Sequence, residues 1–274
     1  MVGAMPAASD RSRLLAALDD EFDHLVALGE GLGEEEWETR SEVPGWTVKD
    51  NYSHVIGTEL MLLGRPDQSV DVGEAPHLRN DIGRFNEVSV LARRSRPGAE
   101  VLAELVEVVE ARRAALAGMS EDDFDAESFT PAGKDTYGRF MQIRVFDCWI
   151  HEQDCREPLG RPGHDAGPAV EVALDEMATA MGFVVGKKAG AADGQSVRLQ
   201  LTGPTARTID VRVDGRATVV DDLDQPTTTI TIPTLLWVRF AAGRRPGDPS
   251  HPAVTIDGDQ ALGRSVIENA AYTI

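Results

Sequence analysis

The segment at residues 140–156, FMQIRVFDCWIHEQDCR, combines apolar and titratable side chains at helical spacing. At 100° per residue, one face of the predicted helix carries Phe140, Ile143 and Ile150 together with four side chains that can be charged. These four are Arg144, Asp147, His151 and Asp154. The other sides of the helix are also largely apolar, which predicts that it is buried. Burial of such groups costs free energy unless they pair or bind a metal, so the segment predicts a site.

A metal centre is one interpretation of this pattern. A catalytic zinc ion takes three protein ligands and keeps one position open for water or substrate. Asp147 and His151, four residues apart, could supply two ligands from one helix. The third must come from another helix, and the best candidate is His54, seven residues after Thr47. Thr47-Val48-Lys49-Asp50 is typical of a capping box that opens a helix.

Structural interpretations remain open beside the metal centre. Helical periodicity places His54 opposite the apolar stripe of its own helix, which predicts a position at the surface or at a pocket edge. Asp147 and His151 could equally form a buried carboxylate–imidazole pair. Arg144 could form an ion pair with Asp147 or Asp154. We expect Asp154 to orient a metal ligand or to cap local backbone rather than to bind the metal itself. Arg144 and Asp154 would both lie behind the ligands and contact them.

The remaining candidates for chemistry are weaker. His77, His164 and His251 stand alone in predicted loops, and we expect them to be exposed to solvent. His24 falls beside the apolar stripe of the first helix and is predicted to be a surface residue. The acidic residues 34–36 are typical of a solvated loop. No GxSxG, P-loop, GxGxxG or HExxH motif occurs in the chain.

Composition narrows the class of partner. The chain has 274 residues, 42% hydrophobic and 27% charged, with a net charge of −19. Such an acidic balance argues against nucleic acids and anionic membrane surfaces. No apolar run approaches the roughly 18 residues of a membrane span, and the N-terminus lacks the apolar core of a signal peptide, so we expect a cytoplasmic protein. Cys148 and Cys155 would lie roughly 10 Å apart on one helix, too far for a disulfide.

Helices dominate the first part of the chain. Apolar periodicity and breaking residues predict helices at about 9–31, 47–63, 79–94, 99–117, 140–156 and a further segment ending near 185, with Ser9 capping the first. The short connections between most of these helices favour an up-down bundle. Residues 1–190 are therefore predicted to form a helical bundle.

The pattern changes at the sequence GAADG, residues 190–194. Alternating segments predict strands at 197–201, 208–213, 217–220, 227–232 and 254–256, the first two joined as a hairpin around Gly203-Pro204. Short helices are predicted at 235–242 and 261–270. Residues 191–274 are thus predicted to form a small α+β domain.

Three parts of the chain, in the same order, resemble the family of mycothiol-dependent maleylpyruvate isomerases. VPGWTVKDNYSHV (43–55) resembles the segment that opens the second helix of that family's DinB-like bundle. RVFDCWIHEQDCREPLGRP (144–162) resembles its late helix, with an H-x-x-D element and a following G-R-P. TIPTLLWVRFAAGRRP and VTIDGDQALGRSVI resemble its sterol-carrier-protein-like C-terminal domain.

The resemblance implies a ligand set and a functional arginine. A divalent metal, usually zinc, is held in the family by a histidine of the second helix and by an acidic residue and a histidine of the late helix. These positions are His54, Asp147 and His151 here, although the family's isomerase has glutamate where this chain has the shorter Asp147. The functional arginine of the C-terminal domain would be Arg239 or Arg244.

The resemblance also implies mycothiol as a cosubstrate. A metal that binds the thiol lowers its pKa, so that thiolate forms near neutral pH. The thiolate would then isomerise a cis double bond by adding and leaving, or attack an electrophile and stay attached. The shorter Asp147 favours S-transfer. The partners would be a small thiol and an electrophile, bound by a monomer or homodimer. A non-enzymatic carrier of a metal or small ligand, or a DinB-like hydrolase that activates water, is the alternative.

Overall fold

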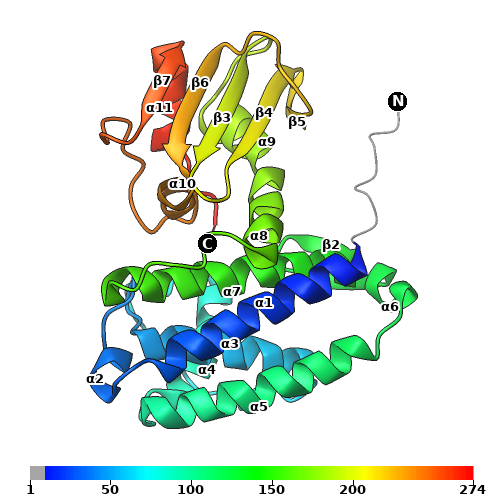
Figure 1. Cartoon of the computed structure of the whole chain (residues 1–274), viewed down its shortest axis with the longest axis vertical. Helices are drawn as coiled ribbons and strands as arrows, with labels where there is room; N and C mark the ends of the chain where they lie inside the picture. Colours follow the sequence, from blue (N-terminus) through cyan, green and yellow to red (C-terminus); the bar gives the residue numbers. More distant parts are fainter. Residues whose placement is uncertain (1–9, 274) are drawn as a thin grey trace. The chain divides into compact units, whose positions relative to one another are not determined.

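The computed structural model describes residues 10–273 and divides the chain after His164 into two compact units. The first unit is helical and the second combines helices with a sheet (Figure 1). This confirms the predicted fold class, an α domain followed by an α+β domain. The division lies earlier than the expected position at residue 190, because the helical turns at 181–188, which follow the helix at 168–179, pack on strands of the sheet.

Seven helices and one hairpin make up the described part of the first unit. They are α1 (Arg11–Glu30), α2 (Glu34–Trp37), α3 (Val48–Leu62), α4 (Asp81–Arg93), α5 (Gly98–Ala117), α6 (Glu121–Asp125), β1 (Glu127–Thr130), β2 (Gly133–Thr136) and α7 (Tyr137–Leu159). Helix α7 packs against α1 and α3, and α5 packs against the same two helices (Figure 1). Helix α7 therefore contacts both α1 and α3, in addition to α6 and the β1–β2 hairpin.

Local sequence signals set the ends of the helices that carry the site. Thr47 caps α3 as predicted: its side chain accepts from the Asp50 N–H, and the Asp50 carboxylate accepts from the Thr47 N–H at 2.9 Å. The predicted cap Ser9 lies outside the described residues, and Asp10 caps α1. Helix α7 ends at Gly160, which has the left-handed φ of 62° that favours glycine.

Apolar packing surrounds α7 on most sides, as its sequence predicts. Met141, Val145, Cys148, Trp149 and Cys155 are all completely buried. The polar residues between them, from Arg144 to Asp154, are therefore held inside the bundle, where each needs a partner.

The second unit contains a five-stranded sheet with the order β5-β4-β3-β6-β7. Its elements are α8 (Pro168–Thr179), α9 (Met181–Phe183), the π-helical turn η1 (Val184–Lys188), β3 (Ser196–Thr202), β4 (Arg207–Asp214), β5 (Arg216–Val220), β6 (Thr228–Pro233), α10 (Thr234–Ala241), β7 (Thr255–Gly258) and α11 (Gln260–Glu268). Strands β3 and β4 pair as the predicted hairpin, and β3 also pairs in parallel with β6. Across residues 10–273, no helix is long and apolar enough to cross a membrane.

Candidate metal centre

The structure brings His54, Asp147 and His151 together, and we call them the α3–α7 cluster. His54 Nε2 lies 3.1 Å from Asp147 Oδ2, and His151 Nε2 lies 3.6 Å from Asp147 Oδ1. One ligand atom from each residue lies within 4.8 Å of the others. Two imidazole nitrogens and a carboxylate oxygen form a donor set that suits zinc.

Of the two positions expected for His54, at the surface or at a pocket edge, the surface position is wrong. Its side chain is only 4% exposed, because α3 is covered by α4, α5 and α7 and is buried along most of its length. Periodicity within one helix identifies the strongest apolar stripe, but a helix in the middle of a bundle is buried on other faces too.

The α3–α7 cluster is closed on the histidine side and open at the carboxylate. His54 and His151 side chains are 4% and 8% exposed, whereas the Asp147 side chain is 29% exposed. A cation held by these three ligands would therefore keep a solvent-facing position beside Asp147. This is the arrangement of a catalytic rather than a structural zinc site.

Hydrogen bonds orient the ring of His151 toward the cluster. Asn51 Nδ2 donates to Thr47 O at 2.8 Å, which leaves Asn51 Oδ1 as an acceptor 2.9 Å from His151 Nδ1. Asp154 Oδ2 lies 3.2 Å from the same nitrogen. Because both groups accept, Nδ1 carries a proton and Nε2 faces Asp147.

A buried chain of charges holds Asp147 in place. Arg144 Nη1 donates to Asp147 Oδ2, and Arg144 Nη2 donates to Glu59 Oε1 at 2.8 Å. Arg112 Nε donates to the other oxygen of Glu59 at 2.7 Å. Sequence reasoning missed Glu59 and Arg112. A usable signal for Arg112 was its position in the buried stripe of α5, at helical spacing from Leu105, Val108 and Leu116.

Burial and charge set the protonation of the α3–α7 cluster. Burial by itself raises the pKa of Asp147, but His54 and the permanently charged Arg144 outweigh it and hold that pKa well below its usual value. Burial lowers the pKa of His54. Burial also opposes the charge of His151, but hydrogen bonds with Asp147 and Asp154 raise its pKa. The cluster therefore presents an ionised carboxylate between two buried imidazoles.

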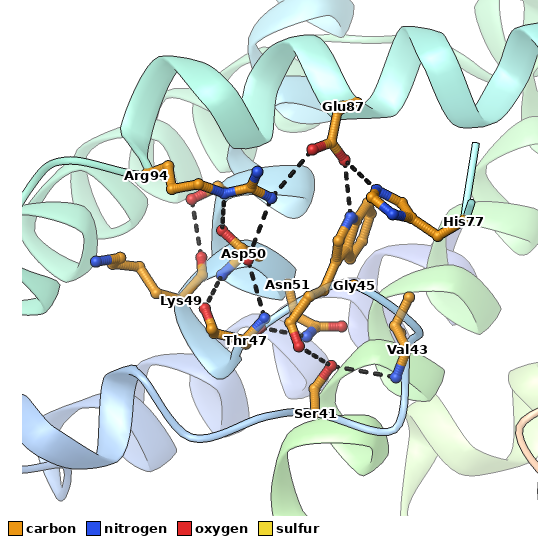
Figure 2. Close-up of polar contacts among 12 residues, drawn as sticks. Ser41, Val43, Gly45, Thr47, Lys49, Asp50, Asn51, His77, Glu87 and Arg94 are labelled. Atoms are coloured by element: carbon orange, nitrogen blue, oxygen red, sulfur yellow. Dashed lines mark hydrogen bonds and ion pairs between the residues drawn. The ribbon is translucent and has the colours of Figure 1, made fainter. Parts of the chain in front are cut away.

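Trp46 packs against both histidines of the cluster. Its ring centroid lies 5.5 Å from that of His54 and 5.7 Å from that of His151. Trp46 Nε1 donates to the buried Glu87 Oε2 at 2.9 Å, and Arg94 lies 3.0 Å from the other oxygen of Glu87 (Figure 2). Sequence reasoning missed this contact.

The expectation that His77, His164 and His251 are isolated and exposed is wrong. His77 Nε2 lies 3.2 Å from Glu87 Oε2, and its ring packs on Gly45, where an added Cβ would lie 2.5 Å from it (Figure 2). The side chain of His164 is completely buried. His251 is half-buried. Each loop folds back on a helix or on its own backbone, which a sequence pattern does not reveal.

Other expectations from the sequence have mixed outcomes. Residues 34–36 are mostly exposed, but they form α2 rather than a loop. Cys148 and Cys155 form no disulfide, as expected, and both thiols are buried. The two arginine candidates belong to the second unit. Arg239 Nη1 donates to Leu235 O at 3.2 Å, and Arg244 Nη1 donates to Ala242 O at 3.0 Å.

Comparison with known proteins identifies both units. The profile of the mycothiol maleylpyruvate isomerase N-terminal domain matches residues 18–156, and that of the MDMPI C-terminal domain matches residues 171–264. No curated protein matches the chain significantly.

Two solved structures have the same fold. One is described as the crystal structure of the mycothiol-dependent maleylpyruvate isomerase, and the other as a variant of it with one histidine replaced by alanine. Each is 20% identical to this chain, over 90% of this chain and 92% of the other, with TM-scores of 0.58 and 0.56. At this identity, the likeness shows the fold.

Proposed function

Because the chain belongs to the mycothiol maleylpyruvate isomerase family, we propose that it is a metal-dependent enzyme with mycothiol as cosubstrate. We further propose that His54, Asp147 and His151 hold the metal, with zinc as the expected ion. The observation that carries this proposal is the convergence of these three side chains from α3 and α7 around a solvent-facing carboxylate.

The chain's own residues would prepare the site for a thiol. A zinc ion bound there would supply a Lewis-acid position that lowers the pKa of a thiol toward neutrality. Arg144 keeps Asp147 ionised, and Asn51 and Asp154 hold His151 with Nε2 toward the cluster. Trp46 covers the histidines, so thiol and electrophile would approach from the side of Asp147.

The reaction would begin with attack of the mycothiol sulfur on an electrophilic carbon. In an isomerisation, the new carbon–sulfur bond lets the former cis double bond rotate, and the thiol then leaves. In an S-transfer, the carbon–sulfur bond persists and the leaving group of the electrophile, such as the halide of an aryl halide, departs with its bonding electron pair. Asp147 is one methylene shorter than the glutamate of the family's isomerase, and this difference favours S-transfer.

The proposal also includes a functional arginine in the second unit and a cellular location. The functional arginine that the family resemblance implies is proposed to be Arg239 or Arg244, since a guanidinium binds carboxylate groups well. We propose a cytoplasmic location, where small thiols are kept reduced. A monomer or homodimer is expected.

A thiol panel tests the proposed function. Zinc-loaded and chelator-treated protein would be incubated with maleylpyruvate or with an aryl halide, in the presence of mycothiol, glutathione or no thiol. We expect turnover only when both zinc and mycothiol are present. The product would be the isomer of maleylpyruvate or, from the aryl halide, the aryl thioether of mycothiol. Turnover without any thiol would instead indicate a hydrolase, and no turnover of either electrophile would contradict a thiol-dependent enzyme.

A further inference from the structure

A second group of titratable side chains lies between α1 and α7, outside the α3–α7 cluster. Glu21 of α1, Glu152 of α7 and His164, which follows α7, form this α1–α7 cluster. One ligand atom from each lies within 4.8 Å of the others, and all three side chains are completely buried. The proposed function makes no use of these residues.

Glu21 is the least satisfied member of the cluster. Among the residues that the structure describes, neither of its carboxylate oxygens has a hydrogen-bond partner. Its Oε2 lies 3.6 Å from His164 Nδ1, too far for a hydrogen bond. A buried carboxylate without hydrogen bonds is costly, so this position calls for a partner that the protein side chains do not provide.

Glu152 points toward the same place. Its Oε1 accepts from Arg156 Nε at 2.7 Å, which fixes the carboxyl group. Its Oε2 lies 2.5 Å from His164 Nδ1. The free face of Glu152, the unpartnered Glu21 and Nδ1 of His164 therefore converge on one buried point.

The ring of His164 is held by contacts on several sides. Its Nε2 lies 3.2 Å from Asp20 Oδ2, and the ring of His24 stacks on it with centroids 3.6 Å apart and planes at 6°. Such a carboxylate on the outer nitrogen is the usual partner of a metal-binding histidine, and it leaves Nδ1 as the nitrogen that faces the cluster.

The backbone of His164 is also constrained. Its φ is 50°, the only positive φ of a non-glycine residue in the described part of the chain. Its carbonyl oxygen accepts from Trp149 Nε1 at 2.9 Å and from Gln153 Nε2 at 3.1 Å. Two donors from α7 therefore hold this histidine in a conformation that most residues avoid, and its side chain then reaches the cluster.

We propose that Glu21, Glu152 and His164 form a second, enclosed binding site for a divalent cation, with Asp20 as the residue that positions His164. Two carboxylates and a neutral imidazole match the charge and donor preference of Zn²⁺ or Mn²⁺. A bound cation would replace the proton between His164 Nδ1 and Glu152 Oε2. The side chains of Asp20 and His24 beside the cluster are 22% and 40% exposed, so we expect a cation to enter from their side.

The competing interpretation is a buried network in which Glu21 is a neutral acid. Burial, followed by the nearby charges of Glu152 and Asp20, raises the pKa of Glu21 well above its usual value. A proton on Glu21 would remove the need for a cation. The two interpretations differ in whether the protein binds a second metal ion.

Metal stoichiometry separates them without any measurement of activity. The full-length protein, stripped with chelator and titrated with Zn²⁺ or Mn²⁺, would be analysed by isothermal calorimetry and elemental mass spectrometry. We expect two cations per wild-type chain and one per chain of the His54→Ala/His151→Ala variant. Glu21→Gln introduces a neutral side chain of the same shape. Added to the double-histidine variant, it should abolish binding of the remaining cation and the rise in Tm that this binding causes.

Asp20→Asn provides a graded second variant, since loss of such an outer partner lowers metal affinity by about 10–100-fold. Circular dichroism would confirm that each variant is folded, and Glu21→Gln in the wild-type background serves if the double-histidine variant is not. The proposal is overturned if folded protein lacking the α3–α7 histidines binds no cation, or if Glu21→Gln leaves the stoichiometry unchanged.

Discussion

Helix α7 carries two clusters of similar residue types in different surroundings. His151 belongs to the α3–α7 cluster and the next residue, Glu152, belongs to the α1–α7 cluster, because consecutive residues of a helix point about 100° apart. The first cluster has a carboxylate that is 29% exposed, whereas the three side chains of the second are fully enclosed. An open cluster can admit a substrate, and a closed one can only stabilise the fold.

The clusters also differ in how their carboxylates are neutralised. Asp147 has the permanent charge of Arg144 directly on one oxygen. Glu152 has Arg156 in the same role, but Glu21 has no hydrogen bond from any described residue. We therefore expect the α3–α7 cluster to keep its geometry without a metal, and the α1–α7 cluster to depend on one.

The largest effect is expected from Arg144→Met. This change leaves the buried Glu59 and the partly exposed Asp147 without their shared partner, and breaking a buried pair such as Arg144–Glu59 costs about 3–5 kcal/mol. Urea unfolding of the metal-free protein would measure it. Arg156→Met is the matched control on the other cluster. Because Arg156 bonds one carboxylate where Arg144 bonds two, its loss should be smaller, and an equal loss would contradict this difference.

Two smaller effects on the free energy of unfolding, of opposite sign, are expected from substitutions in the α1–α7 cluster. In metal-free protein, Glu152→Gln should lower the free energy of unfolding by about 1–3 kcal/mol, since Arg156 and His164 lose a charged acceptor. Glu21→Gln should raise it, because an unpartnered buried carboxylate becomes a neutral amide. Chemical denaturation at pH 7 would check both signs. A loss of stability in Glu21→Gln would show that Glu21 already has a stabilising role without a cation.

Asp147→Glu tests whether side-chain length sets the fate of the thiol. The longer carboxylate is the residue type that the family resemblance implies for an isomerase, so we expect the ratio of isomerisation to S-transfer to rise about tenfold, equivalent to about 1.4 kcal/mol. Parallel assays with maleylpyruvate and an aryl halide would measure the ratio. Asp71→Glu, in an exposed loop, is the control, and an unchanged ratio in Asp147→Glu would remove side-chain length as the cause.

The smallest effect is expected from Thr47→Ala, which removes the cap of α3. Loss of such a cap costs about 1 kcal/mol. Because Thr47 also anchors Asn51, which orients His151, zinc affinity at the α3–α7 cluster should fall as well. Ser120→Ala removes the cap of α6, and zinc binding should be unaffected there. Equal zinc affinities in both variants would show that the cap of α3 does not affect zinc binding at the α3–α7 cluster.

The fold and part of the candidate site could be predicted from the sequence for clear physical reasons. Helical periodicity, the Thr47 capping box and the alternating strands are local patterns, and the structure confirms them. Asp147 and His151 share a turn of one helix, so their proximity was also a local property. Residues 165–190 belong to the same unit as the sheet. This assignment depends on tertiary packing and could not be predicted from the local sequence pattern.

The remaining features depend on contacts between distant segments. His54 meets Asp147 across 93 residues, and His164 meets Asp20 across 144. Glu59 and Arg112 each look like ordinary charged residues of a helix until α3, α5 and α7 are assembled around them. A sequence pattern identifies the helix that bears such a residue, but not the partner that it meets.

The zinc content of His54→Ala tests the central claim most directly, namely that three side chains from α3 and α7 hold the metal of a thiol-activating enzyme. Wild type, His54→Ala and the control His251→Ala would be purified, equilibrated with zinc and analysed for zinc per chain. The account predicts that His54→Ala loses one zinc ion per chain and that His251→Ala loses none. Equal zinc content in all three proteins would contradict it.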